Sequence, residues 1–193
     1  MAGDAGIYQE EPLMSATTFK LSIASLLALA ALTPASAFAV TLNGTVTGGT
    51  LALSTSATPS FSVTLDGTDQ LPTYTLPMAI NDLRGTGAGW NATITSTTIT
   101  TGTQSLSTSA STITGVTSTC AGTTCTAATN AIGYPLAVPA ATTAPAAVKL
   151  FNAAANSGLG KFTVTPTVSV SVPGNAYAGS YSSTITLAAV SGP

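Results

Sequence analysis

Short runs in which apolar residues alternate with threonine or serine are the feature that most limits the fold of this chain. On an extended strand, neighbouring side chains point to opposite faces, so a period of two gives one buried face and one solvated face. Threonine is the polar residue that best fits such a pleated surface. The runs lie at residues 40–46, 50–54, 61–65, 74–80, 90–99, 111–117, 132–138, 162–172 and 180–189.

Glycine and proline punctuate these runs, as expected for tight turns between strands. Eight or nine strands at such short spacing predict an all-β domain, specifically a Greek-key or immunoglobulin-like β-sandwich. The exception is the Ala-rich segment 146–155, AAVKLFNAAA. It could form a short helix, or a loop that packs Leu150 and Phe151 under the sandwich.

Residues 1–39 have the pattern of a leader with a signal peptide. Lys20 precedes an apolar run at 21–32, and an A-x-A pattern ends at Ala39. The acidic residues before Met14 do not suit a signal peptide, so translation could begin at Met14. The run is too short to span a bilayer, and we expect cleavage after Ala39, secretion, and one β-sandwich domain over 40–193.

Charge is scarce after residue 39, and the chain has no His. The charged residues there are Asp66, Asp69, Asp82, Arg84, Lys149 and Lys161. Nucleic acid and anionic membranes require clustered Lys and Arg, so we expect neither as a partner. Without His or a free thiol the usual catalytic bases and nucleophiles are missing, which predicts a protein that is not an enzyme and needs no cofactor. Low net charge also favours self-association.

Cys120 and Cys125 are the only cysteines. In a secreted chain this spacing predicts a disulfide that closes a small loop, because a zinc site would need further ligands.

Asp66 and Asp69 are the first pair of carboxylates that could form a site. They could bind Ca²⁺ together with backbone carbonyls, or act as a glycosidase-like pair. The alternative is structural: Asp66-Gly67 makes a turn after a strand, and Asp69 caps the loop.

The stretch 81–91, NDLRGTGAGWN, gathers the only Trp and the only Arg of the chain. Asp82 and Arg84 are two residues apart and would point to the same side of a strand, where they could pair and brace the glycine-rich turn that follows. Trp90 would then enter the core as the next strand begins. A Trp that stacks on a sugar would instead have to be exposed.

Asp82, Arg84, Gly85, Gly89 and Trp90 form a D-x-R-G-x-x-x-G-W pattern that resembles the signature of WxL-like bacterial cell-surface proteins. The closing segment resembles that of the same family at Val172-Pro173, Tyr177-Ala178-Gly179, Tyr181 and Ser191-Gly192-Pro193. The chain departs from the family in having Ala92 two residues after Trp90 and Ile185-Thr186-Leu187 in place of Trp-Thr-Leu. The resemblance implies an exported β-sandwich displayed on the cell surface, in some members held non-covalently to peptidoglycan.

Three functions remain open from the sequence. The first is a secreted, non-enzymatic structural protein of the cell surface, with cell-wall polymer or other copies of itself as partner. The second is a filament subunit in which residues 40–56 complete a neighbour's sheet, with Val40, Leu42, Val46, Leu51 and Leu53 as the apolar positions. The third is a glycan-binding module that uses Trp90 with Asp66, Asp69 or Arg84. The runs 93–95 and 163–165 could also form a flat ice-binding face, although any outward strand face has the same pattern.

Overall fold

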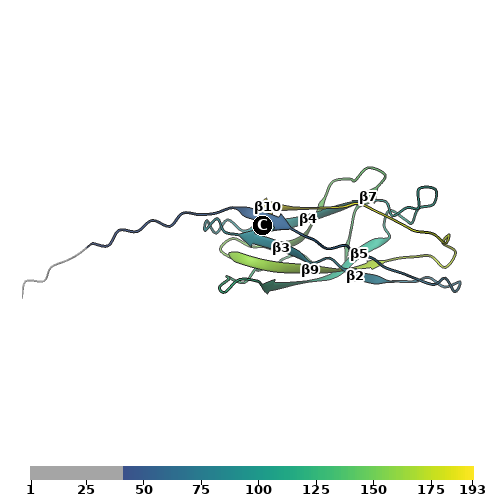
Figure 1. The fold of residues 1–193 in the computed structure, drawn as a ribbon, viewed down its shortest axis with the longest axis horizontal. Coiled ribbons are helices and arrows are strands. Elements are labelled where there is room, and N and C mark those ends of the chain that lie inside the picture. Colours follow the sequence, from purple (N-terminus) through teal and green to yellow (C-terminus); the bar gives the residue numbers. More distant parts are fainter. Residues whose placement is uncertain (1–40) are drawn as a thin grey trace, which may run out of the picture. The chain divides into compact units, whose positions relative to one another are not determined.

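The computed structural model describes residues 41–193, which form ten strands in two sheets (Figure 1). The all-β sandwich predicted from the sequence is confirmed, with ten strands rather than eight or nine. Thr45–Pro193 make up one compact unit, and residues 41–44 belong to a separate one. The predicted signal peptide, the alternative start at Met14 and Val40 lie outside the described residues.

The larger sheet has β9 at its centre, because β9 pairs with three other strands. Its strands are β1 (Leu51–Ser54), β2 (Thr73–Thr75), β3 (Met78–Asp82), β5 (Ser111–Cys120), β6 (Leu136–Ala137) and β9 (Gly160–Val170), with the order β1-β3-β9-β5-β6 and β2 also on β9. The smaller sheet consists of β4 (Trp90–Thr97), β7 (Ala140–Ala141), β8 (Val148–Ala153) and β10 (Ile185–Ser191), all paired with β4.

The main core lies between the two sheets and follows the period of two. In β9, Phe162, Val164, Pro166, Val168 and Val170 are buried, whereas Thr163, Thr165, Thr167 and Ser169 between them are half-exposed. The partners from the other strands include Met78, Ile80, Trp90, Ile94, Ile113 and Leu150, each at most 1% exposed. Burying one such aliphatic side chain contributes about 1.5–3 kcal/mol, so this layer supplies the main stabilisation of the fold.

The helix considered for residues 146–155 is wrong, since this segment holds strand β8. Leu150 and Phe151 are buried, and β8 pairs with β4 in an antiparallel register that is shifted once by a bulge. Pairing and burial of these two side chains outweigh the helix preference of the surrounding alanines. Residues 41–193 contain no helix of the length and apolar character that a bilayer span requires.

Four of the predicted strands differ in the structure. The described part of the run 40–46 forms no strand, and the run 132–138 keeps only the two-residue strand β6. The run 74–80 is split into β2 and β3 around Pro77, which has no N–H to offer the sheet. The run 61–65 forms no strand either. Within residues 41–193, the segment 56–65 makes no backbone–backbone hydrogen bond, although Phe61 and Val63 are half-buried at alternate positions. We call residues 56–65 the unpaired segment.

Amide hydrogen exchange should separate these regions. We expect the amides of the unpaired segment to exchange rapidly in the monomer, and those of the central strand β9 to exchange slowest, since exchange protection follows hydrogen bonding and local stability. Native-state exchange read by mass spectrometry or NMR provides the test. Equal protection of residues 56–65 and of β9 in a monomer would contradict the assignment.

Candidate functional site

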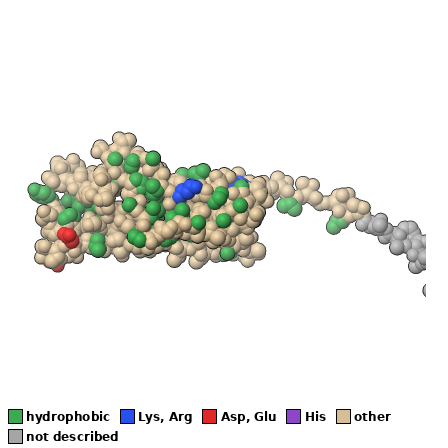
Figure 2. Space-filling view, turned by 180° about the vertical axis from the view of Figure 1, so that it is seen from behind, with side chains coloured by type: hydrophobic (Ala, Val, Ile, Leu, Met, Phe, Trp, Pro, Cys, Tyr) green, Lys and Arg blue, Asp and Glu red, His purple; other side chains and the backbone are tan. Residues whose placement is uncertain are grey.

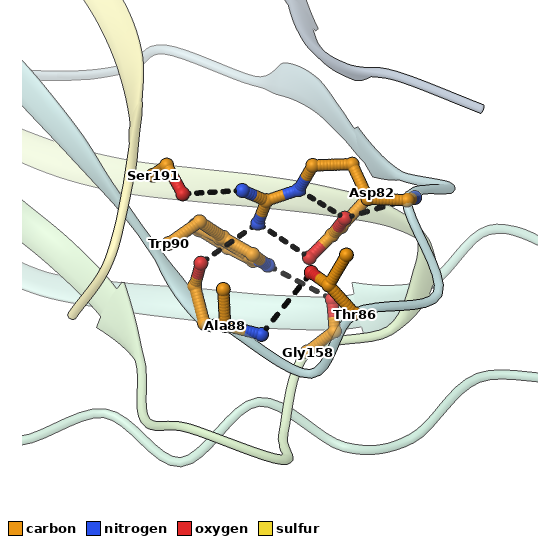
Figure 3. A network of polar contacts seen from close by, with 8 residues as sticks. Asp82, Thr86, Ala88, Trp90, Gly158 and Ser191 are labelled. Atoms are coloured by element: carbon orange, nitrogen blue, oxygen red, sulfur yellow. Dashed lines mark hydrogen bonds and ion pairs between the residues drawn. The ribbon is translucent and has the colours of Figure 1, made fainter. Parts of the chain in front are cut away.

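The rarest side chains of the chain meet at one corner of the sandwich, which we define as residues 81–91. Asp82 ends β3 and its side chain is fully buried. Arg84 Nε donates to Asp82 Oδ1 at 2.8 Å, and Arg84 Nη2 donates to Asp82 Oδ2 at 2.9 Å. The pair is therefore bidentate, the strongest geometry for an Arg–carboxylate contact (Figure 3).

Arg84 also connects this corner to the end of the chain. Its Nη2 donates to Gly89 O at 2.7 Å, and its Nη1 donates to Ser191 Oγ (Figure 3). Gly192 N donates to Gly89 O at 3.1 Å, and Asn91 Nδ2 donates to Gly192 O at 2.7 Å. The two stretches that carry the family resemblance, far apart in sequence, thus form one hydrogen-bonded unit.

Trp90 is fully buried at the start of β4. Its ring centroid lies 5.7 Å from that of Phe151 and 6.2 Å from that of Phe162. Its Nε1 donates to Gly158 O at 2.8 Å, so the indole has both an apolar environment and a partner for its N–H. Because a Trp that stacks on a sugar has to be exposed, Trp90 does not serve the glycan-binding alternative.

Two glycines allow the chain to pass close to Trp90. Gly158 has φ 68°, and a Cβ there would lie 2.4 Å from Ala153 Cβ and 2.7 Å from Trp90 Nε1. Gly89 has φ 71°, and a Cβ there would lie 2.5 Å from Ala153 O. Only glycine tolerates both the positive φ and this spacing.

The electrostatics of the corner are those of a permanent ion pair. Hydrogen bonding from Arg84 lowers the pKa of Asp82 below its ordinary value, against the effect of burial. The same contact raises the pKa of Arg84. Neither group can exchange a proton near neutral pH, so the geometry of the corner suits bracing rather than acid–base chemistry.

Asp66 and Asp69 serve local hydrogen bonds. Asp66 Oδ1 accepts from Thr68 N, Thr68 Oγ1 and Gln70 Nε2, and the Thr68 side chain is the main reason that the pKa of Asp66 is lowered. Asp69 Oδ1 accepts from Gly174 N at 2.9 Å. In the part of the chain that the structure describes, no group of three or more His, Cys, Asp or Glu residues is placed to hold a metal ion.

Cys120 and Cys125 form the expected disulfide, with their Cα atoms 5.9 Å apart. The loop that it closes is attached to the beginning of β9, because Ala121 N donates to Lys161 O and Thr126 N donates to Leu159 O. This places the disulfide beside the corner end of β9.

A groove of about 950 Å³ lies in the other half of the sandwich, and the sequence reasoning did not predict it. One wall is the unpaired segment and the other is residues 176–185. Its apolar floor includes Leu76, Ile99, Leu106, Val138 and Val172, and no lining residue is charged. The signal in the sequence was the alternating run 61–65, whose lack of a strand partner only the tertiary structure reveals.

The outer surface of the larger sheet carries a regular array of hydroxyl groups, which we call the threonine face. Adjacent strands place these residues side by side, with Thr75 opposite Thr167, Thr117 opposite Thr165 and Thr119 opposite Thr163. Its members are Thr73 and Thr75 of β2, Thr117 and Thr119 of β5, and Thr163, Thr165 and Thr167 of β9, all exposed or half-exposed. The sequence indicated only the 163–165 part of this array.

Replacing Arg84 by Ala should destabilise the fold by about 3 kcal/mol near neutral pH, because it leaves the Asp82 carboxylate buried without its partner. The folded pKa of wild-type Asp82 is depressed, so its stabilising contribution is present above the unfolded pKa and is lost as pH falls through the folded value. Without Arg84, burial raises that pKa and the carboxyl becomes neutral earlier.

The stability difference between wild type and Arg84→Ala should therefore narrow as pH falls, first through the raised pKa of the unpaired carboxyl and then further below about 4. Urea unfolding at several pH values, followed by Trp90 fluorescence, measures it. Lys161→Ala removes the same charge from an exposed position and should change stability little. A stability difference between wild type and Arg84→Ala that stays constant with pH would contradict the stabilising role of the Asp82–Arg84 ion pair.

Gly158→Ala should lower the free energy of unfolding by about 1–3 kcal/mol or more, because the new methyl group would overlap Ala153 and Trp90 and residue 158 has a positive φ. Gly133→Ala is the matched control, since a Cβ there meets nothing within 4 Å. Thermal unfolding of both variants provides the measurement, and equal stabilities would show that Gly158 is not needed for the packing of Trp90.

Comparison with known proteins gives one match. Neither the curated proteins nor the solved structures that were compared with this sequence matched it. The family model described as "WxL domain surface cell wall-binding" matches residues 40–192, which include the corner, the groove, the threonine face and the closing segment. The resemblance seen in the sequence is confirmed, and the chain belongs to the family of WxL domain surface cell wall-binding proteins.

Proposed function

We propose that this protein is a non-enzymatic component of the cell surface that holds to a cell-wall polymer non-covalently through the threonine face. Membership of a cell wall-binding family supports the location and the class of partner. The regular array of hydroxyls on β2, β5 and β9 is the observation that carries the choice of surface.

Within residues 41–193, the carboxylates, the arginine and the cysteines are engaged in structural contacts, which supports a binding role. Asp82 and Arg84 are bonded to each other, the cysteines are paired, and Asp66 and Asp69 are engaged in turns. On the face shown in Figure 2, charged side chains are sparse and most of the surface is neutral. A surface of this kind suits an uncharged or weakly charged partner rather than an ionic one.

The threonine face suits a polysaccharide because each hydroxyl both donates and accepts hydrogen bonds, as sugar hydroxyls and acetamido groups do. Threonines in neighbouring strands repeat at about 4.8 Å, and those along one strand at roughly 6.7 Å. Their χ1 angles are restricted by β-branching, so little side-chain entropy is lost when the array binds. The weak individual contacts then add up along an extended polymer.

Replacing Thr163, Thr165 and Thr167 together by Val should weaken binding to purified cell-wall material at least about tenfold, since each neutral hydrogen bond contributes roughly 0.5–1.5 kcal/mol. Valine keeps the shape and the strand preference of threonine, so the fold should be retained. A sedimentation assay with purified cell-wall sacculi measures the affinity.

Thr123, Thr142 and Thr143 replaced by Val give the matched control, because these exposed threonines lie in loops outside the strands of the array. The control should bind like wild type. Unchanged binding by the β9 triple variant, or an equal loss in the loop variant, would reject the threonine face as the binding surface.

A further inference from the structure

We propose that the groove accepts residues 41–47 of a second copy of this chain as an added strand along β2, which joins molecules head to tail. This interaction uses the backbone edge of β2, whose Thr73 and Thr75 side chains also belong to the threonine face, but it does not depend on the proposed wall binding. Three features support it: an open sheet edge beside the groove, an exposed apolar segment, and the point at which the chain enters β1.

The acceptor is the outer edge of β2. Val170 N donates to Pro72 O, and Leu76 N donates to Pro166 O, so these positions on either side of β2 bond to β9. By the alternation of an antiparallel ladder, the backbone groups of Thr73 and Thr75 point away from β9. The unpaired segment makes no backbone–backbone bond in residues 41–193, so it does not complete this edge. An open edge of this kind is a template for another strand.

The groove beside this edge is open to solvent and measures about 950 Å³, which is enough space for several apolar side chains. Tyr74 and Leu76 line it from the β2 side, Ile99 and Leu106 from the segment after β4, and Val172 from the segment after β9. Half of the sandwich thus has space for apolar side chains that the unpaired segment, with only Phe61 and Val63 half-buried, does not fill.

The donor is the segment before β1. Residues 41–50 have no regular secondary structure, and Leu42 and Val46 are 95% and 99% exposed. On a strand, Leu42, Gly44 and Val46 would lie on one face, with threonine or asparagine at the positions between them. The segment therefore offers two apolar side chains, four residues apart, that can be buried on insertion into an apolar groove. Leu51 and Leu53 already pack within β1 of their own sheet, so the donor is shorter than the 40–56 segment expected from the sequence.

Donor and acceptor also agree in charge and length. Neither residues 41–47 nor the lining of the groove contains a charged residue, so no ion has to be desolvated or paired on insertion. Seven residues of strand extend over roughly 23 Å, and the unpaired segment that forms the groove wall would extend over roughly 33 Å. The donor therefore fits within the length of the groove.

The arrangement favours a second copy over the chain's own segment. Gly49 N donates to Leu83 O, so the chain enters β1 at the corner end, beside Arg84. The groove lies beyond the other end of β1. A chain would have to reverse at Gly48-Gly49 and pass back along β1 to fill its own groove, whereas a neighbour's segment enters directly. Two different surfaces then meet in each contact, so each added subunit leaves one donor and one groove for the next, in a ring or an open chain.

The first experiment places charge on the donor. Leu42→Asp with Val46→Asp should reduce assembly at least about tenfold, because the two charges would have to enter an apolar groove. Thr41→Asp with Thr45→Asp adds the same charge to the outward face of the same strand and should assemble nearly as well as wild type. Light scattering after size-exclusion chromatography and electron microscopy measure assembly, and Trp90 fluorescence checks that each variant is folded.

The second experiment blocks the acceptor from either wall. Val63→Arg fills the groove from the unpaired segment, and Ala176→Arg fills it from the opposite wall, so one variant suffices if the other fails to fold. Each should be monomeric alone. Mixed with the Leu42→Asp/Val46→Asp variant, which keeps an open groove, either should form heterodimers and no longer species, because one intact donor and one intact groove remain.

In wild-type assemblies, the amides of Thr73 and Thr75 should gain protection from hydrogen exchange that they lack in the monomeric variants. Equal assembly by the two Asp double variants, or a wild-type chain that stays monomeric at high concentration, would overturn the proposal. So would a groove block that abolishes cell-wall binding and leaves assembly intact, since the groove would then be a glycan site. The Thr163, Thr165 and Thr167 triple Val variant should assemble normally, which separates this proposal from that of wall binding.

Discussion

The rest of the structure depends on the buried ion pair between Asp82 and Arg84. Burying the Asp82 carboxylate without a partner would destabilise the fold by several kcal/mol. Arg84 supplies that partner by folding back over the turn. That position brings the guanidinium to Gly89 O and Ser191, which fixes where β4 starts and where β10 ends. Trp90 can then enter the core with its N–H bonded to Gly158. One local contact between residues two apart therefore connects three distant parts of the chain.

The two halves of the sandwich differ in how completely they are packed. Around the corner, aromatic rings, glycines with positive φ and the closing segment fill the interior. Ala92, where the family pattern has Leu, lies opposite Phe151 in the β4–β8 register, and the ring of Phe151 contacts Trp90. The small residue leaves space that the aromatic ring occupies. In the other half, the unpaired segment covers a second and smaller apolar cluster without joining a sheet. Most of the buried apolar residues thus belong to the main core, and the half with the groove is less completely packed.

The sequence was a good guide wherever the structure depends on local periodicity. The all-β fold, most strands and the pairing of Cys120 with Cys125 followed from alternation, turn residues and spacing. It failed for residues 146–155, because the strand β8 is imposed by pairing with β4 and by burial of Leu150 and Phe151. The prediction of a strand at 61–65 was also wrong. Apolar and polar residues alternate there, but within residues 41–193 no strand pairs with this segment. The groove and the threonine face could not be foreseen, because both depend on which distant strands become neighbours.

The backbone enters and leaves the sandwich at the same corner. Gly49 bonds to Leu83 on the way into β1, and Gly192 bonds to Gly89 on the way out of β10, so the two points are anchored to residues only six apart in sequence. A domain with this geometry can be inserted into a loop of another protein or fused at either point without disturbing its fold. The groove lies at the opposite end. The fold therefore has one end at which another protein can be joined and a different end that carries the groove.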